Sequence, residues 1–354
     1  FSVQIRKIPI VVTDSRGLEN KLLEINHLHT SFRIRDDYYA AVDDVPLTVN
    51  KNEVLAVVGE SGSGKSAFAF SIMRLHNRAK TEGEILFKGE DVITMSNSRL
   101  NEVRGLNMAM IFQDPLTALN PLITVEEQIG EALFLHDRKL SKANIRAKVI
   151  DLLNQVGIPR PELVSEQYPH ELSGGMRQRV MIAIAISNDP ELLIADEPTT
   201  ALDVTIQAQI LDLIRDLKQK MDAGIILITH DLGVVAEMAD RVAVMYAGEI
   251  VEVTDVKTLF DDPKHPYTRS LLNSMPNAVE KDEKLHVIQG VVPPLPQLPR
   301  TGCRFKDRIP WIDESAHEEE PTLHEIEPGH FVRCTCYQHF YFPNKEEVEL
   351  SGLS

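Results

Sequence analysis

Residues 59–66 read Gly59-Glu60-Ser61-Gly62-Ser63-Gly64-Lys65-Ser66. This order fits the phosphate-loop pattern G-x-x-x-x-G-K-[ST]. An apolar run at 54–58 precedes the loop and a helical pattern at 66–75 follows it, which is the strand–loop–helix context that the pattern requires. A glycine-rich turn with a chance lysine is the alternative, and this context argues against it. The sequence therefore predicts a triphosphate site on an α/β fold.

The residue types of this loop suit a nucleoside triphosphate. Glycines let backbone N–H groups turn inward around phosphate oxygens, and the N-terminus of the following helix adds a favourable dipole. We expect Lys65 to reach the β- and γ-phosphates as a catalytic residue, and the Ser66 hydroxyl to bind Mg²⁺. The residues predicted to contact the nucleotide here are Gly59, Ser61, Gly62, Ser63, Gly64, Lys65, Ser66 and Ala67.

A second apolar run, at 192–195, ends in the paired carboxylates Asp196 and Glu197. Ligands bind at the C-terminal ends of strands in open α/β sheets, so both side chains are expected at the phosphate site. We predict that Asp196 holds Mg²⁺, directly or through water, and that Glu197 polarises the attacking water as general base. An acidic pair that opens a solvated loop is the alternative, and the upstream phosphate loop disfavours it.

Apolar strand patterns alternate with amphipathic helix patterns downstream. Strands are predicted at 191–195, 224–229 and 241–246, and helices at 174–186, 205–221 and 232–239. The helix at 205–221 carries one apolar stripe, formed by Ile206, Ile210, Leu213, Ile214 and Leu217. Such alternation predicts a parallel sheet with both faces covered.

Composition excludes several classes of protein. The chain has 354 residues and a formal net charge of −16, and this acidic balance argues against a broad nucleic-acid-binding face. No apolar run approaches the roughly 18–20 residues that cross a bilayer, and we find no secretory signal pattern near the start. Three cysteines do not make a disulfide scaffold. We expect a cytoplasmic protein of two or three domains.

Residues 172–179 hold a second candidate anion site. Ser173 and the backbone amides of Gly174 and Gly175 stand at the start of a predicted helix, where anions bind. The segment Leu172-Ser173-Gly174-Gly175-Met176-Arg177-Gln178-Arg179 resembles the LSGGQ signature of ATP-binding cassette (ABC) ATPases, with Met176 where Gln is more usual. Standing alone, it would read as a serine-capped helix. The resemblance implies two cassettes that pair head to tail, each supplying this signature to the other's ATP.

Three further segments match the same family in order and spacing. Gln113 resembles the Q-loop glutamine, residues 200–203 resemble the D-loop that ends in Asp203, and His230 resembles the switch histidine. The resemblance implies that Gln113 binds Mg²⁺ and senses the γ-phosphate, that Asp203 lies at the dimer interface, and that His230 contacts the γ-phosphate. Taken singly, these residues also fit an exposed glutamine, a helix N-cap aspartate and a capped histidine.

The residue that stacks on adenine is not decided by the sequence. Phe32 lies where the family often places an aromatic ring, judged by its distance from Ala41 and Val42. Tyr38 or Tyr39 could take this role instead, and packing in the core is an equal alternative for all three.

Other segments resemble one subfamily, the oligopeptide and dipeptide importer ATPases. They are residues 196–207, residues 263–272 and the proline run after Gly290. The resemblance implies a P-loop NTPase (RecA-like) core with an antiparallel β subdomain, a helical signature subdomain at about 120–178 and a small C-terminal domain. We expect a flexible extension at 1–20, an ABC ATPase domain at 21–262 and the importer-type C-terminal domain at 263–354.

This resemblance implies an ATPase that uses MgATP to power import of oligopeptides or dipeptides. The implied partners are a second, OppF-like ABC ATPase subunit, two transmembrane permease subunits and, through the complex, an extracellular peptide-binding protein, with no nucleic acid. The implied location is the cytoplasmic side of the cell membrane. Alternatives are an importer of nickel or another small solute, a soluble ABC ATPase outside transport, and a regulatory cassette that does not hydrolyse ATP. Glu197 and His230 argue against the last of these.

The tail cysteines depart from the family pattern. Many relatives carry four cysteines there, and some bind an iron–sulfur cluster. Cys303 and Cys334 match the outer two, whereas Ile309 and about Ala316 stand at the inner two positions. Cys336 could add a third ligand and His317 or His330 a fourth. Because such clusters need four ligands, we predict reduced structural thiols and no iron–sulfur cluster.

Overall fold

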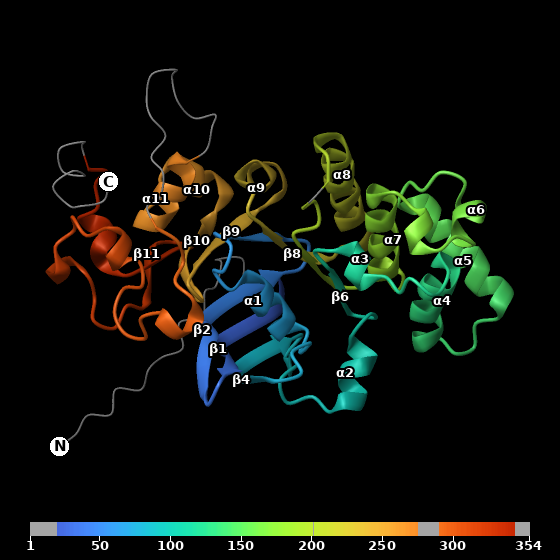
Figure 1. Cartoon of the computed structure of the whole chain (residues 1–354), viewed down its shortest axis with the longest axis horizontal. Helices are drawn as coiled ribbons and strands as arrows, with labels where there is room; N and C mark the ends of the chain where they lie inside the picture. Colours follow the sequence, from blue (N-terminus) through green and yellow to red (C-terminus); the bar gives the residue numbers. More distant parts are fainter. Residues whose placement is uncertain (1–19, 201, 275–289, 344–354) are drawn as a thin grey trace.

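The computed structural model describes residues 20–200, 202–274 and 290–343 (Figure 1). The predicted N-terminal extension lies outside the described residues, apart from residue 20, and so does Ala201 of the D-loop segment. In the described ranges, no helix is long and apolar enough to cross a bilayer.

A parallel sheet forms the centre of the fold. Its strands are β3 (Val54–Val58), β6 (Met108–Ile111), β7 (Leu192–Asp196), β8 (Gly224–Thr229) and β9 (Arg241–Tyr246). Their order across the sheet is β9-β3-β8-β7-β6, with every neighbouring pair parallel. The mostly parallel α/β fold predicted from the sequence is therefore confirmed.

Side chains alternate between the two faces of this sheet. On β7, Leu192 and Ile194 join the core beneath the antiparallel sheet, whereas Leu193 and Ala195 join the core beneath the helices α7 (Gly174–Ile186) and α8 (Val204–Met221). All four residues are fully buried. A strand covered on both faces reads as a continuous apolar run, which is why no polar alternation marks β7 in the sequence.

A long antiparallel hairpin lies on one face. It consists of β1 (Lys21–Ile34) and β2 (Asp37–Asn50), with β4 (Ala79–Phe87) and the short β5 (Glu90–Asp91) completing the sheet in the order β2-β1-β4-β5. The helix α1 (Lys65–Ile72) contributes Phe68 and Ile72 to the core between the two sheets. In the sequence, short β-like runs at 22–25 and 38–42 predict only short strands here. The exposed outer ends of the hairpin, with register shifts along β1, lack the apolar alternation that marks a strand.

A group of helices extends from the far edge of the sheet, around β6 (Figure 1). It contains α3 (Pro115–Ala118), α4 (Val125–His136), α5 (Lys142–Gln155), α6 (Pro161–Ser165) and α7. Ser141 is the N-cap of α5, since its side chain accepts a hydrogen bond from Asn144 N–H. Although the sequence at 125–157 has a helical pattern throughout, it forms two helices, because the chain turns at 137–141 between α4 and α5. A separate helix, α2 (Asn97–Val103), contributes Leu100 and Val103 to the core beneath the antiparallel sheet.

The part of the chain from residue 249 onward, called the C-terminal segment here, is joined to the central sheet. The strand β10 (Glu249–Asp255) pairs with β9 on one side and with β12 (His330–Arg333) on the other, and β11 (Leu323–Glu327) completes the edge. The helices α9 (Leu232–Met238), α10 (Val256–Asp261) and α11 (Pro266–Asn273) lie nearby (Figure 1). The rings of Tyr246, Tyr267 and Phe305 pack together with centroids 4.7 to 5.5 Å apart. They tie this segment to the ATPase core through apolar contact.

Candidate nucleotide site

The phosphate loop is a tight turn between β3 and α1. Gly64 has a φ of 104°, and a Cβ placed there would lie 2.5 Å from the backbone oxygen of Ala41. Only glycine fits such a position. A hydrogen bond from another part of the chain also fixes the loop, because Gly248 N–H, between β9 and β10, donates to the Ser63 carbonyl at 2.8 Å. The sequence prediction of a glycine-dependent turn opening a helix is confirmed.

Lys65 turns its ammonium group onto this loop. Its Nζ donates to the backbone oxygens of Gly59 at 2.8 Å and Glu60 at 3.0 Å. The side chain is 6% exposed. Burial lowers its pKa, while the carboxylates of Glu197, Asp196 and Glu60 act in the opposite direction. A cation in this poorly solvated position attracts phosphate oxygens more strongly than it would in water.

Asp196 and Ser66 face each other across the site. Asp196 ends β7 and is 1% exposed, and the Ser66 hydroxyl donates to its Oδ1 at 3.3 Å. Burial is the main cause that raises the pKa of Asp196, and the Ser66 hydrogen bond opposes it. Both groups offer oxygen ligands of the kind that Mg²⁺ prefers. A nearby cation would therefore stabilise the charged form of this buried carboxylate more than that of a solvent-exposed one.

Glu197 is the centre of a hydrogen-bonded group. Its Oε2 accepts from Gln113 Nε2 at 3.1 Å and from the Thr200 hydroxyl at 2.8 Å, and it lies 3.5 Å from Nδ1 of His230. The Glu197 backbone has a φ of 46°, and its N–H donates to the carbonyl of Ile228 on β8. A non-glycine residue in this left-handed conformation stores strain that the surrounding contacts must offset. Such strain is common at functional sites.

Sheet order brings three predicted residues together. Gln113, Glu197 and His230 follow β6, β7 and β8, which are adjacent parallel strands. The C-terminal ends of parallel strands meet at one edge, so these residues converge although the chain separates Gln113 from Glu197 by 84 positions. His230 is 62% exposed on its side chain and Glu197 only 15%. The group therefore opens to solvent on the histidine side.

The sequence interpretation missed three contacts at this site. Thr200 lies in the segment compared with the D-loop, yet its bond to Glu197 was not predicted. Tyr267 and Arg308 also contact the phosphate loop, through Glu60. The three-residue spacing of Glu197 and Thr200 offered a local signal for the first contact. Nothing local signals the others, because they lie 207 and 248 residues from Glu60.

The signature segment lies apart from the phosphate loop of its own chain. Ser173 caps α7, accepting from Met176 N–H at 3.3 Å, and both Ser173 and Gly174 are exposed. In Figure 1, α7 stands among α3 to α6, away from α1. No hydrogen bond within the described ranges links 173–175 to 59–66. Asp203 is likewise exposed and caps α8, with its side chain accepting from Ile206 N–H at 3.0 Å.

The three candidate adenine-stacking rings all lie near the turn between β1 and β2. Phe32 meets the ring of His76 edge-on at 4.9 Å between centroids. Tyr39 lies beneath the guanidinium of Arg300, 5.6 Å from the ring centroid, and Tyr38 is 54% exposed. The partly buried Phe32 and the exposed Tyr38 are both compatible with stacking. The assignment to Phe32 stays a prediction.

This geometry defines a class of protein. A phosphate loop follows one parallel strand, and a neighbouring strand of the same sheet ends in two carboxylates, as in P-loop nucleoside triphosphatases. Comparisons with known proteins narrow the class. Residues 42–200 match the ABC transporter family, and residues 251–314 match the oligopeptide/dipeptide transporter C-terminal region.

Two relatives of known name align with this chain over nearly its whole length. The oligopeptide transport ATP-binding protein OppD of Lactococcus lactis subsp. lactis (strain IL1403) is 52% identical over 328 residues, which are 92% of this chain and 97% of the relative. AppD of Bacillus subtilis (strain 168), also an oligopeptide transport ATP-binding protein, is 48% identical over 90% of this chain and 97% of its own length. This chain therefore belongs to the ABC transporter family, among its oligopeptide transport ATP-binding proteins.

A solved structure supports the same fold. The ATP-binding cassette MJ0796, in a dimeric post-hydrolysis state bound to ADP and Pi, superposes with a TM-score of 0.61 at 26% identity. The match covers 66% of this chain and 98% of that one.

Proposed function

We propose that this chain hydrolyses ATP to power the import of oligopeptides or dipeptides through an ABC transporter. One observation carries the proposal: the Glu197 carboxylate, held by Gln113, Thr200 and His230, follows directly on Asp196, whose side chain bonds Ser66. This places a candidate general base beside a phosphate loop. The printed names of the relatives, and the match of residues 251–314, support peptides as the cargo.

The roles of the residues follow from their positions. The backbone amides of 59–66 and the Lys65 ammonium bind the phosphates and stabilise the charge that develops during transfer. Glu197 accepts the proton of the attacking water. Gln113 and His230, both in contact with Glu197, orient this carboxylate and the γ-phosphate. Ser66, Asp196 and Gln113 would hold Mg²⁺, whose charge would help to neutralise the phosphate oxygens.

The second half of each site comes from a partner cassette. Ser173 and Gly174 are exposed at the start of a helix that continues through the half-buried Gly175, which suits an anion brought by another molecule. Asp203 is exposed as well, as expected for a residue at a dimer interface. The dimeric state named for the superposed cassette supports this pairing. Closure of two cassettes on ATP then requires that ATP bind the closed state more tightly than the open one.

The remaining partners belong to the membrane complex. The chain pairs with a second, OppF-like cassette and contacts two permease subunits on the cytoplasmic side of the cell membrane. An extracellular peptide-binding protein delivers the cargo. Leu116 and Leu122 are 63% and 81% exposed shortly after Gln113, and they supply an apolar surface near the nucleotide for a permease contact.

Substitution of the general base tests the proposal. Glu197→Gln keeps the shape and the hydrogen-bonding capacity of the side chain but cannot accept the proton, so turnover should fall by about 10² or more while ATP binding persists. Glu162→Gln, at an exposed position in α6, is the matched control and should behave as wild type. Hydrolysis unchanged in Glu197→Gln would contradict the role of Glu197. Failure to copurify with two integral membrane subunits would contradict the transport role.

A further inference from the structure

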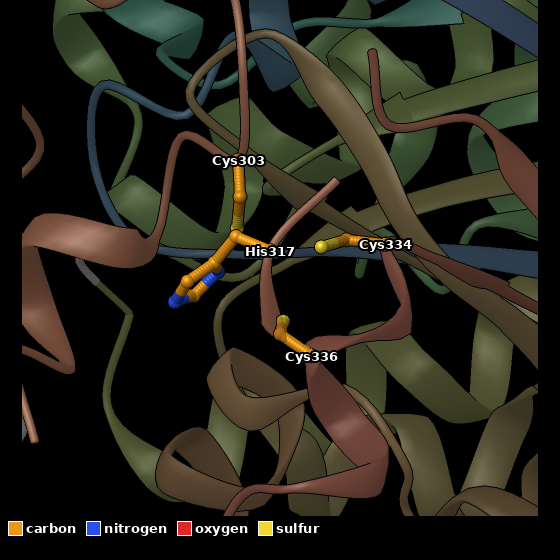
Figure 2. A group of neighbouring side chains, drawn as sticks. All are labelled: Cys303, His317, Cys334 and Cys336. Atoms are coloured by element: carbon orange, nitrogen blue, oxygen red, sulfur yellow. The ribbon is translucent and has the colours of Figure 1, made fainter. Parts of the chain in front are cut away.

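A cluster of sulfur and nitrogen ligands lies in the C-terminal segment, away from the nucleotide site. It consists of Cys303, His317, Cys334 and Cys336, and one ligand atom from each of the four lies within 4.8 Å of the others. Figure 2 shows the four side chains as neighbours, with Cys303 and His317 on stretches of chain separate from the one that carries Cys334 and Cys336. We call these residues the tail cluster.

The three cysteines of the tail cluster are buried, His317 is half-buried, and the ligand atoms have few competing partners. The three cysteines are at most 4% exposed, and none is in a disulfide. Nδ1 of His317 is buried without a hydrogen-bond partner among the described residues. An unpaired buried nitrogen costs about 1–3 kcal/mol unless something binds it. The arrangement therefore favours an additional ligand for the His317 ring.

The tail cluster does not fit a four-iron cluster. In that group each cysteine binds a different iron, so the four sulfurs stand around the whole cluster. Two of the family's four cysteine positions are filled here by Ile309, which is buried in the apolar core, and Ala316, which packs against the same core. The ligand atoms of the tail cluster are gathered around one point instead. Cys336 and His317 stand outside the family pattern.

We propose that Cys303, His317, Cys334 and Cys336 bind one zinc ion in tetrahedral coordination. Zinc takes thiolate and imidazole ligands in closed Cys₃His structural sites. With Zn–S bonds of about 2.3 Å, tetrahedral geometry separates two sulfurs by about 3.8 Å. Ligand atoms already within 4.8 Å of one another reach this geometry by small side-chain shifts.

The surroundings of the tail cluster support a thiolate-bound cation. Glu318 N–H donates to Sγ of Cys334 at 3.5 Å, the kind of bond that supports a metal-bound thiolate. Arg304 and Arg333 line a small cavity together with Cys303 and Cys334. Three thiolates and one divalent cation would carry a net charge of −1 beside these two guanidinium groups, which also lie 3.5 and 3.6 Å from Oε1 of Glu249.

His330, the other histidine considered as a fourth ligand, is engaged elsewhere. Its Nε2 lies 2.8 Å from Oε1 of Glu252, and both side chains are buried. Glu252 also accepts from the backbone N–H groups of Lys264 and His265. The structure thus distinguishes His317 from His330, which sequence alone left open.

The zinc ion would stabilise a region that has little regular structure. It links the loop at Cys303, the turn at His317 and the 3₁₀ helix Thr335–Gln338 that contains Cys336. Arg308, five residues after Cys303, bonds Glu60 of the phosphate loop. The proposed ion therefore fixes the segment that supports the nucleotide site, without contacting the nucleotide.

Metal analysis of the purified full chain tests this proposal. Elemental analysis by inductively coupled plasma mass spectrometry should find one zinc per chain and no iron, and a sulfide assay should find no acid-labile sulfide. Replacement by Co²⁺ should give the intense visible bands of a tetrahedral site and thiolate-to-cobalt charge transfer. This spectrum is measured on the wild-type chain, so it remains decisive even if a variant fails to fold.

Variants then identify the ligands. Cys336→Ser and His317→Ala should each weaken Zn²⁺ binding at least about tenfold in competition with a chromophoric chelator. His339→Ala changes an exposed histidine three residues after Cys336 and should leave the affinity unchanged. Iron and sulfide in equal amounts, or three thiols that titrate freely in a metal-free native chain, would overturn the proposal. So would full zinc retention in the double variant Cys336→Ser/His317→Ala.

Discussion

Arg308 of the C-terminal segment donates two hydrogen bonds to the Glu60 carboxylate of the phosphate loop, at 2.8 and 3.2 Å. Paired bonds of this kind are both strong and directional. Tyr267 reaches the same residue, because its hydroxyl oxygen accepts from Glu60 N–H at 2.7 Å. The C-terminal segment is thus in direct contact with the phosphate loop.

Removal of the Tyr267 hydroxyl should destabilise the chain. Tyr267→Phe removes the partner of the part-buried Glu60 N–H, and the loss of one such hydrogen bond costs about 0.5–1.5 kcal/mol. We expect the free energy of unfolding to fall by this amount in denaturant titration, with weaker ATP binding. Tyr341→Phe, at a residue that is 45% exposed, should change it by less than about 0.5 kcal/mol. Equal effects of the two substitutions would show that the Glu60 contact is not stabilising.

Two glycines should differ in their response to alanine. Gly64→Ala forces a Cβ against the Ala41 carbonyl at a φ of 104°, so it should cost at least about 1–3 kcal/mol and abolish ATP binding. Gly174→Ala adds a methyl group where no atom lies within 4 Å, and thermal unfolding should be unchanged. A Gly64→Ala protein with wild-type stability and ATP affinity would disprove the steric argument.

A negative charge at the signature should block the composite site without harming the fold. Ser173→Asp keeps a good helix N-cap but places a carboxylate where we propose that the partner's triphosphate binds. We expect ATP hydrolysis and ATP-dependent pairing to fall at least about tenfold while thermal unfolding stays the same. Ser141→Asp makes the same change at the N-cap of α5 and should remain active. Unimpaired pairing in Ser173→Asp would exclude the signature from the site.

Asp196 should make stability depend on pH in a defined direction. Burial raises its pKa in the folded chain above the unfolded value, so the folded state binds the proton more tightly. The contribution to stability is present below the unfolded pKa and is lost as pH rises through the folded pKa. Asp196→Asn removes the buried charge, so in the absence of Mg²⁺ and ATP it should unfold at a higher temperature than wild type at neutral pH, although turnover is lost. A lower unfolding temperature would contradict the desolvation argument.

Local features of the sequence were sufficient for much of the site. The phosphate loop, the carboxylates after 192–195 and the N-caps at Ser173 and Asp203 each depend on a few adjacent residues. Such features are determined by backbone conformation and short-range hydrogen bonds, so a motif in its strand–loop–helix context predicts them. The long hairpin of β1 and β2 was underestimated, since its exposed ends lack apolar alternation.

The class of fold, the phosphate loop and the two carboxylates could be predicted from the sequence, because each depends on consecutive residues. Which distant residues meet depends instead on how the whole chain packs. The order β8-β7-β6 brings Gln113 and His230 to Glu197, and the packing of the C-terminal segment brings Arg308 to Glu60 and His317 to three cysteines. The physical reason is that such contacts depend on strand order and on the burial of whole elements, and no local pattern encodes either.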